Sequence, residues 1–139
     1  MRELNPWQQR SAGRNQWRAY YRAYITSPAW YRRREQWVAD ALAELTVLVT
    51  DASEPGTGGE AVIECVGCGA LWRPKNDDLH HASYDRLGEE AHEDLWPMCR
   101  GCHAWIHELM RSTSTWRKLP LSQASPLALA ALHDAIDRG

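Results

Sequence analysis

Four cysteines in two closely spaced pairs constrain this chain more than any other feature. Cys65 and Cys68 form one C-x2-C pair, Cys99 and Cys102 form the other, and thirty residues separate the pairs. Two residues between thiols let one tight turn point both sulfurs at the same ion, and four thiolates complete the tetrahedral shell that structural zinc prefers. Glycines in VGCG and RGC supply the sharp bends that such turns need. The spacing therefore predicts a structural zinc site made of these four residues.

Disulfides and a thioredoxin-like redox pair are the alternative uses of these cysteines. The N-terminus, MRELNPWQQR, lacks the apolar core of a secretory signal, and no window approaches the roughly eighteen apolar residues of a membrane span. We therefore expect a reducing cytoplasm, where disulfides are rare. A redox pair would not need a second copy, so zinc is the preferred interpretation.

The second cysteine pair lies in a segment, residues 79–108, that holds five of the six histidines. His103 and His107 are four residues apart, so on a helix they lie one turn apart and can bind one metal ion. His80 and His81 are adjacent, so on a strand they point to opposite faces. One of the two can therefore bind the metal while its neighbour has a different role.

The string LHHASYDRLGEEAHEDLWPMCRGCHAWIH resembles the HNH endonucleases, and in particular the members stapled by zinc. The upstream YITSPAWYRRREQW, followed by C-x2-C, is similar to the lead-in helix of many phage and bacterial HNH proteins. The resemblance covers roughly residues 24–108. It implies an α+β chain with a ββα-metal core, in which two strands and a helix hold one divalent cation. It also implies DNA as the substrate and the cytoplasm of a bacterial or phage-infected cell as the location.

The resemblance assigns a role to each residue of the catalytic site. His80 would bind the catalytic metal and His81 would be the general base. His103 would be the second metal ligand, and His107 a further ligand or a contact to the phosphate. Asp94 stands where the family has asparagine, which braces the loop between the strands and helps to orient the base. An aspartate can accept the same hydrogen bonds but cannot donate those of the amide, so this departure bears on the rate of the reaction more than on its type.

The chemistry of these side chains fits phosphodiester hydrolysis without the family name. A neutral histidine, whose ordinary pKa is near neutrality, can take the proton of the attacking water. A bound cation stabilises charge on the phosphate and on the leaving oxygen. An all-imidazole site takes Ni²⁺, Zn²⁺ or Mn²⁺ more readily than Mg²⁺, which prefers oxygen ligands. The sequence leaves the choice among these four metals open.

Two non-catalytic functions fit the same sequence. A zinc ribbon with basic helices can bind DNA or RNA without cutting it, and His81 would then be dispensable. A phage packaging accessory protein that keeps a degenerate nuclease fold is the other alternative. The likeness to phage proteins makes a packaging or host protein a further expected partner beside DNA. The presence of all four histidines favours the enzyme, because a degenerate site is expected to have lost at least one.

The N-terminal region is predicted to be helical, basic and aromatic. Residues 1–37 contain eight arginines and two glutamates, whereas the rest of the chain carries eight basic and sixteen acidic residues. Such asymmetry indicates a basic arm for a polyanion beside an acidic body. A second helix is predicted to begin at Pro28 with Ser27 as its cap. Its predicted DNA contacts are Arg32, Arg33 and Arg34.

Aromatic residues at helical spacing mark the first predicted helix. They recur at i, i+3, i+4 and i+7, which we interpret as a core stripe in preference to a base-stacking surface. The stripe consists of Trp17, Tyr20, Tyr21 and Tyr24.

The segments are predicted to form one globular domain. Residues 1–50 are the helical region, 51–60 a flexible connection, 61–112 the zinc-stapled nuclease core, and 113–139 a C-terminal tail and helix. Within the core we predict short strands at 61–65 and 79–83, a loop at 84–94 and a helix that begins at Cys102.

The last helix is predicted to begin with Ser125 as its cap and Pro126 in its first turn. Its predicted buried residues are Leu129, Leu132 and Ile136. No role is predicted for several polar side chains, which we expect to be mostly solvated: Asp77, Asp78, Glu89, Glu90, His92, Glu93, Glu108 and His133.

Overall fold

The computed structural model describes residues 6–52 and 61–139, with side chains described for 13–46 and 61–139. By its internal contacts the chain divides into two compact units, Met1–Glu35 and Gln36–Gly139. The predicted flexible connection begins in the last residues of a helix, and its residues 53–60 lie outside the described part of the chain. None of the helices formed by the described residues is long and apolar enough to cross a membrane.

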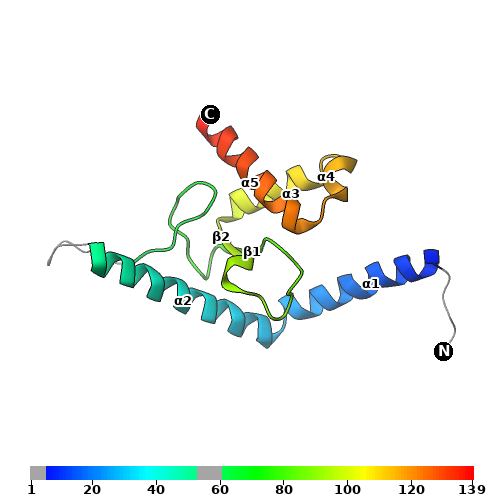
Figure 1. Ribbon diagram of the computed structural model, residues 1–139, viewed down its shortest axis with the longest axis horizontal. Helices are drawn as coiled ribbons and strands as arrows, with labels where there is room; N and C mark the ends of the chain where they lie inside the picture. Colours follow the sequence, from blue (N-terminus) through cyan, green and yellow to red (C-terminus); the bar gives the residue numbers. More distant parts are fainter. Residues whose placement is uncertain (1–5, 53–60) are drawn as a thin grey trace. The chain divides into compact units, whose positions relative to one another are not determined.

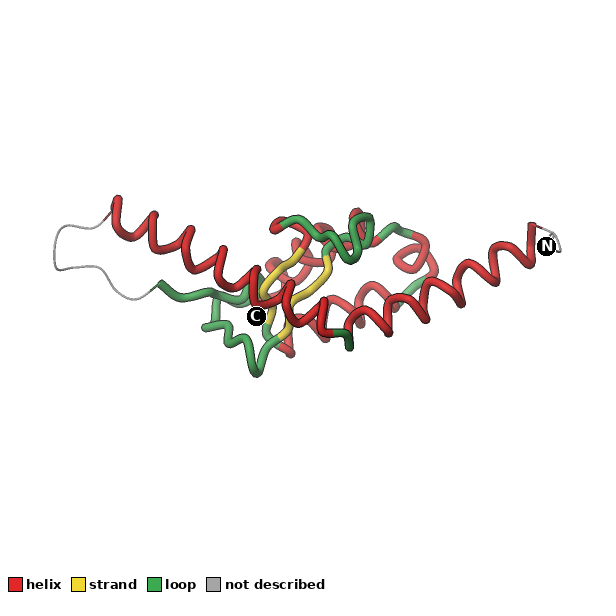
Figure 2. The backbone as a smooth tube through the Cα atoms, turned by 90° about the horizontal axis from the view of Figure 1, so that it is seen from below, coloured by secondary structure: helices red, strands yellow, loops and turns green. Residues whose placement is uncertain are grey.

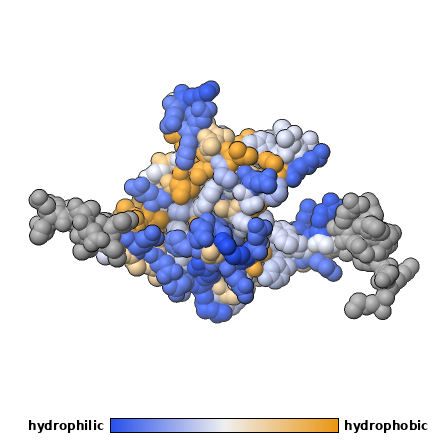
Figure 3. Space-filling view, in the orientation of Figure 1, coloured by the Kyte–Doolittle hydropathy of each residue, from blue (hydrophilic) through white to orange (hydrophobic). Residues whose placement is uncertain are grey.

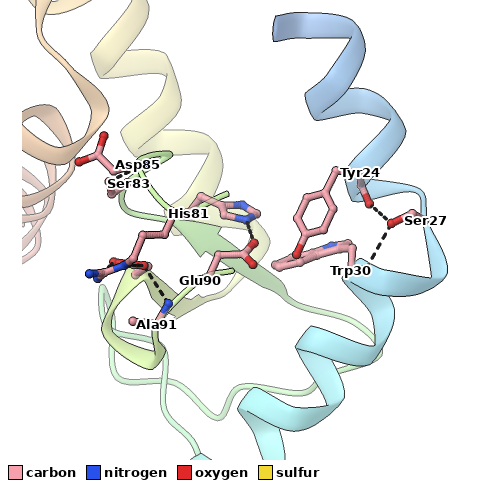
Figure 4. A network of polar contacts seen from close by, with 10 residues as sticks. Tyr24, Ser27, Trp30, His81, Ser83, Asp85, Glu90 and Ala91 are labelled. Carbon is pink, nitrogen blue, oxygen red and sulfur yellow. Dashed lines mark hydrogen bonds and ion pairs between the residues drawn. The ribbon is translucent and has the colours of Figure 1, made fainter. Parts of the chain in front are cut away.

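The first unit contains α1 (Pro6–Ile25) and the beginning of α2 (Pro28–Ala52). The predicted cap at Ser27 is confirmed, because its Oγ accepts a hydrogen bond from the backbone N of Trp30 at 3.3 Å (Figure 4). The predicted core stripe is wrong for two of its four members, since Trp17 and Tyr20 are 39% and 53% exposed. Trp17 instead stacks on Tyr21, one turn further along the same helix, with ring centroids 5.4 Å apart.

The second unit combines helices with a small sheet, which confirms the α+β class. Strands β1 (Asp78–His81) and β2 (Leu95–Met98) form an antiparallel pair (Figures 1 and 2). In this pair His80 lies opposite Trp96, and His81 lies opposite Leu95. Helix α3 (Arg100–Arg111) follows β2 directly. The order is therefore strand, strand, helix.

Two strand predictions need correction. β1 ends at His81, two residues earlier than predicted, and the predicted strand at 61–65 is only an isolated bridge between Glu64 and Leu71. β2 was not predicted at all, because Pro97 interrupts the pattern of a four-residue strand. Proline lacks the N–H of the ladder and is tolerated at a sheet edge, which a two-stranded sheet offers on both sides.

The loop between the strands contains a short 3-10 turn, η1 (His92–Asp94). His92 is half-buried, so the expectation of an exposed side chain is wrong. Its ring stacks on Trp37 with centroids 4.9 Å apart, and its backbone oxygen accepts a hydrogen bond from the Trp37 indole at 3.1 Å. This contact holds the part of α2 that belongs to the second unit against the loop between the strands.

Helices α3 and α5 (Leu121–Arg138) provide most of the main apolar core, and Trp116 of α4 (Ser114–Lys118) packs against it. Side chains of α5 recur one turn apart on the buried face, namely Ala124, Ala128 and Leu132. They pack against Ile106 and Met110 of α3. In Figure 3, hydrophobic residues gather around these helices while much of the remaining visible surface is hydrophilic.

The predicted start of the last helix is wrong. α5 begins at Leu121, since the backbone N–H groups of Gln123 and Ala124 both donate to the oxygen of Pro120 at 2.9 Å. Pro126 therefore lies inside the helix, and Ser125 is completely buried instead of capping it. Of the three residues predicted to be buried, Leu132 is buried and Leu129 is half-buried, whereas Ile136 in the last turn is 44% exposed, so the prediction is wrong for Ile136.

Candidate metal centres

The four cysteines converge as their spacing predicted. Their sulfur atoms all lie within 4.8 Å of one another, and the Sγ atoms of Cys68 and Cys99 are 3.9 Å apart. Four sulfurs at about 2.3 Å from one zinc ion lie about 3.8 Å from each other in a tetrahedron. Gly69, with φ of 77°, closes the first turn in a conformation that favours glycine. The cluster is thus compatible with a structural metal site.

Backbone N–H groups point at the sulfur atoms. The N–H groups of Gly67 and Cys99 each donate to Sγ of Cys65 at 3.3 Å, and that of Cys102 donates to Sγ of Cys99 at 3.4 Å. Burial alone would raise the pKa of Cys65, but the backbone donors outweigh it and lower this pKa to about 7. Burial raises the pKa of Cys99 and Cys102. A cation among the sulfurs would let all four ionise, because a coordinated thiol is deprotonated.

Three histidines form a second cluster. His80 comes from β1, and His103 and His107 come from successive turns of α3. Nε2 of His103 lies 3.1 Å from Nδ1 of His80 and 2.9 Å from Nε2 of His107. Ligand nitrogens of the three residues all lie within 4.8 Å of one another. Three nitrogens bound to one metal at about 2.0–2.1 Å in a tetrahedral site would be about 3.3 Å apart.

Hydrogen bonds alone cannot satisfy this cluster. A neutral imidazole nitrogen without a hydrogen has one lone pair in the ring plane. Nε2 of His103 can therefore accept from only one of its two neighbours. Protonation of His80 or His107 is not a remedy, because burial and the neighbouring imidazoles lower the pKa of His80 to about 2 and that of His107 to about 4. A metal ion at the centre would bind all three lone pairs at once.

The outer nitrogens of two of these histidines have their own partners. Nδ1 of His103 lies 2.9 Å from Oδ2 of Asp78, and Nε2 of His80 lies 3.0 Å from Oγ of Ser125. A carboxylate behind a ligating histidine fixes its tautomer and increases its basicity. Asp78 was expected to be a solvated charge without a role; its side chain is 37% exposed but contacts His103, which was not predicted. Its position two residues before His80, on the same face of a strand, was a signal that could have identified it.

His81 lies on the other face of β1 and does not belong to the cluster. Its Nε2 is 2.8 Å from Oε2 of Glu90, and both side chains are buried, with exposed fractions of 4% and 0% (Figure 4). The prediction of a solvated Glu90 is therefore wrong. Glu90 comes from the irregular loop between the strands, where sequence periodicity gives no information on side-chain direction.

Asp94 braces that same loop. Its carboxylate accepts two hydrogen bonds from Arg86, at 2.8 and 2.7 Å, and one from the backbone N of Ala91 at 2.9 Å. The bond with Arg86 is the main cause that holds the pKa of Asp94 below its ordinary value. The backbone oxygen of Asp94 also accepts from the N–H of Ala82 at 2.8 Å, just beyond β1. Asp94 therefore ties the end of the loop to both strands.

The arginines predicted to contact DNA differ in exposure. Arg32 is exposed, whereas Arg33 and Arg34 are half-buried and make contacts of their own. Helix α1 has no acidic residue but carries three exposed arginines four residues apart, which the sequence analysis did not single out as DNA contacts. We call Arg14, Arg18 and Arg22 the arginine row.

Comparison with known proteins finds no matching family model, no matching curated protein and no matching solved structure. Membership of the HNH family therefore stays a prediction.

Proposed function

We propose that this protein is an HNH-type endonuclease that hydrolyses DNA phosphodiester bonds with a single divalent cation. His80, His103 and His107 would hold the cation, His81 would be the general base, and the four cysteines would hold structural zinc. The observation that carries the proposal is the convergence of three imidazole nitrogens from β1 and α3 within 4.8 Å. The pairing of the adjacent histidine with a buried carboxylate supports a different role for it.

The cation, when bound, would stabilise charge on the phosphate and on the leaving 3′ oxygen. His81 would take the proton of the attacking water on Nδ1, because its Nε2 donates to Glu90. A carboxylate behind a histidine base holds the correct tautomer and stabilises the imidazolium that forms during the reaction. The bond between phosphorus and the 3′ oxygen breaks as the water oxygen attacks phosphorus. The leaving 3′ oxygen then takes up a proton from solvent.

Two acidic residues would share the work that one asparagine does in the family. Glu90 contacts His81 at 2.8 Å and would orient it. Asp94 accepts from Arg86 and Ala91 and braces the loop between the strands. This division supports catalysis despite the departure from the family pattern at position 94.

The N-terminal arginines would provide affinity for DNA. We keep the predicted contacts at Arg32, Arg33 and Arg34, and add the arginine row of α1. Like charges four residues apart on a helix cost about 0.2–0.5 kcal/mol per pair in helix stability, and α1 has no acidic side chain to offset them. Contacts of this kind with phosphates give affinity and salt dependence but no sequence specificity.

The test is cleavage of supercoiled plasmid by the wild type, His81→Ala and His133→Ala, with Mg²⁺, Mn²⁺, Ni²⁺ or Zn²⁺ added in turn. His133 is an exposed histidine outside both clusters, and its Nε2 lies 2.7 Å from the backbone oxygen of Val66. It serves as the histidine control, and the zinc content of His133→Ala shows whether loss of this contact disturbs the cysteine turn. We expect metal-dependent cutting by the wild type and His133→Ala, and a loss of at least 100-fold in His81→Ala. Zinc content measured on the same samples shows whether the fold is retained.

A zinc-stapled module that binds nucleic acid without cutting it is the second candidate. The burial of His81 and Glu90 favours it, because a buried, hydrogen-bonded polar pair can be purely structural. The plasmid experiment separates the two functions. If none of the three proteins cuts with any metal while all bind DNA and retain zinc, the binding module replaces the nuclease.

A further inference from the structure

We propose that Ser125 is a positioning residue of the histidine metal centre. Its hydroxyl oxygen accepts the Nε2–H of His80 and so keeps Nδ1 of His80 free for the metal. This inference rests on the metal centre proposed above. Ser125 lies on α5, outside residues 24–108, to which the resemblance to HNH nucleases is confined.

The two nitrogens of His80 have opposite surroundings. Nε2 faces the Ser125 oxygen at 3.0 Å, while Nδ1 faces the imidazole of His103 at 3.1 Å. The exposed fractions of Ser125 and His80 are 0% and 1%, so water does not compete for either contact. A buried N–H requires an acceptor, and a hydroxyl oxygen can supply one. The same hydroxyl could also donate to Nε2, so we place the proton of neutral His80 on Nε2 because Nδ1 is the nitrogen that faces His103 and the proposed metal.

Helix packing fixes the position of this hydroxyl. Ala124 and Ala128, on the same helix, are 2% and 0% exposed and belong to the core that also contains Ile106 of α3. α3 carries the other two histidines of the centre. The contact between α3 and α5 thus forms the core and also sets the distance from Ser125 to the histidine cluster.

Removal of the hydroxyl would change the tautomer of His80. Without an acceptor at Nε2, the proton is better placed on Nδ1, where it can bond to His103. In that state Nδ1 has no lone pair for a metal, and the tautomer must be converted before binding. Loss of such a supporting contact typically weakens metal binding by about 10–100-fold.

The decisive measurement is calorimetric titration with Ni²⁺ of the full chain whose cysteine site already holds zinc. Wild type, Ser125→Ala and Ser122→Ala are compared, because Ser122 is an exposed serine on the same helix. We expect Ser125→Ala to bind Ni²⁺ about 10–100-fold more weakly, Ser122→Ala to match the wild type, and zinc content to be equal in all three. Equal Ni²⁺ affinity in Ser125→Ala and the wild type would overturn the role of Ser125 alone.

A measurement on the wild type avoids any folding defect of the variant. Long-range ¹H–¹⁵N correlation spectra are recorded on protein that holds zinc at the cysteine site alone. They report which nitrogen of each histidine carries the proton. We expect the proton of His80 on Nε2, and a proton on Nδ1 would refute the proposal. If the wild type binds no metal beyond the cysteine-bound zinc, the histidine centre itself is wrong, and the role of Ser125 fails with it.

Discussion

Gly67→Ala should damage the cysteine centre from within, because the structure leaves no room for a methyl group between Cys65 and Cys68. A Cβ at position 67 would lie 2.7 Å from Cδ2 of Leu132 and 2.8 Å from Sγ of Cys102. Non-bonded carbon atoms prefer about 3.5–4.0 Å, so at least one neighbour has to move by close to an ångström.

Neither neighbour can move at low cost. Leu132 is 4% exposed and packed in the core formed by α3 and α5. Sγ of Cys102 belongs to the four-sulfur cluster, and metal–ligand distances tolerate deviations of only about 0.2 Å. Overpacking of this kind costs about 1–3 kcal/mol. Part of that cost should be observed as weaker zinc binding.

Gly101→Ala is the matched control. Gly101 lies in α3 next to Cys102, so the prediction that it supplies a sharp bend is wrong, and a Cβ there would meet no atom within 4 Å. An alanine in a helix is favoured over glycine by about 0.5–1 kcal/mol, so this variant should be as stable as the wild type or slightly more stable. The free energies of unfolding of the two variants should therefore differ by about 1.5–4 kcal/mol, with Gly67→Ala the less stable.

The assay is thermal unfolding at a fixed concentration of free zinc, combined with the transfer of zinc to a coloured chelator. Gly67→Ala should unfold at a lower temperature and release zinc faster than the wild type and Gly101→Ala. If Gly67→Ala keeps both the stability and the zinc release rate of the control, the close packing of α5 against the cysteine turn is wrong.

Two further predictions concern charged groups. In Arg86→Gln, the native-state pKa of Asp94 should return towards 3.8. The wild type should therefore have a larger free energy of unfolding than this variant above about pH 4, and the difference should vanish as the pH falls through the lowered native pKa of Asp94. Arg138→Gln, which removes an exposed ion pair with Asp134, should show no such pH-dependent difference, and a pH-independent difference for Arg86→Gln would contradict the ion pair as its cause. Replacement of the arginine row by glutamine, in a His81→Ala background, should reduce the slope of log affinity for duplex DNA against log salt by about 2–3. Gln16→Ala on the same helix should leave the slope unchanged, and an unchanged slope in the row variant would remove these arginines from the interface.

Local spacing was sufficient to predict that the four cysteines come together and that His103 and His107 share one helix face. The two C-x2-C pairs and the His103–His107 pair depend only on the geometry of a turn and of a helix, and both sets converge in the structure. The opposite directions of His80 and His81 follow from the alternation of a strand. These predictions required no knowledge of how distant segments pack.

The partners of those side chains could not be predicted in the same way. Glu90 reaches His81 from an irregular loop, and Ser125 reaches His80 from a helix 45 residues away in sequence. Ser125 followed by Pro126 is also a typical helix start, so the local signal favoured a cap. The buried face of α5 determined where the helix begins, because packing of Ala124, Ala128 and Leu132 against α3 stabilises a helix that begins at Leu121 and contains Pro126.

Helix α3 links the two centres through adjacent residues of one turn. Cys99 and Cys102 at its start belong to the sulfur cluster, and His103, the next residue, lies at the middle of the histidine cluster. A helix of 12 residues is marginal in water by itself, so its first turn depends on what holds the cysteines. Zinc at the cysteines would fix the start of α3, and the direction in which His103 and His107 project follows from that start. The cysteine centre would thus decide the geometry of the histidine centre, although it would take no part in the chemistry itself.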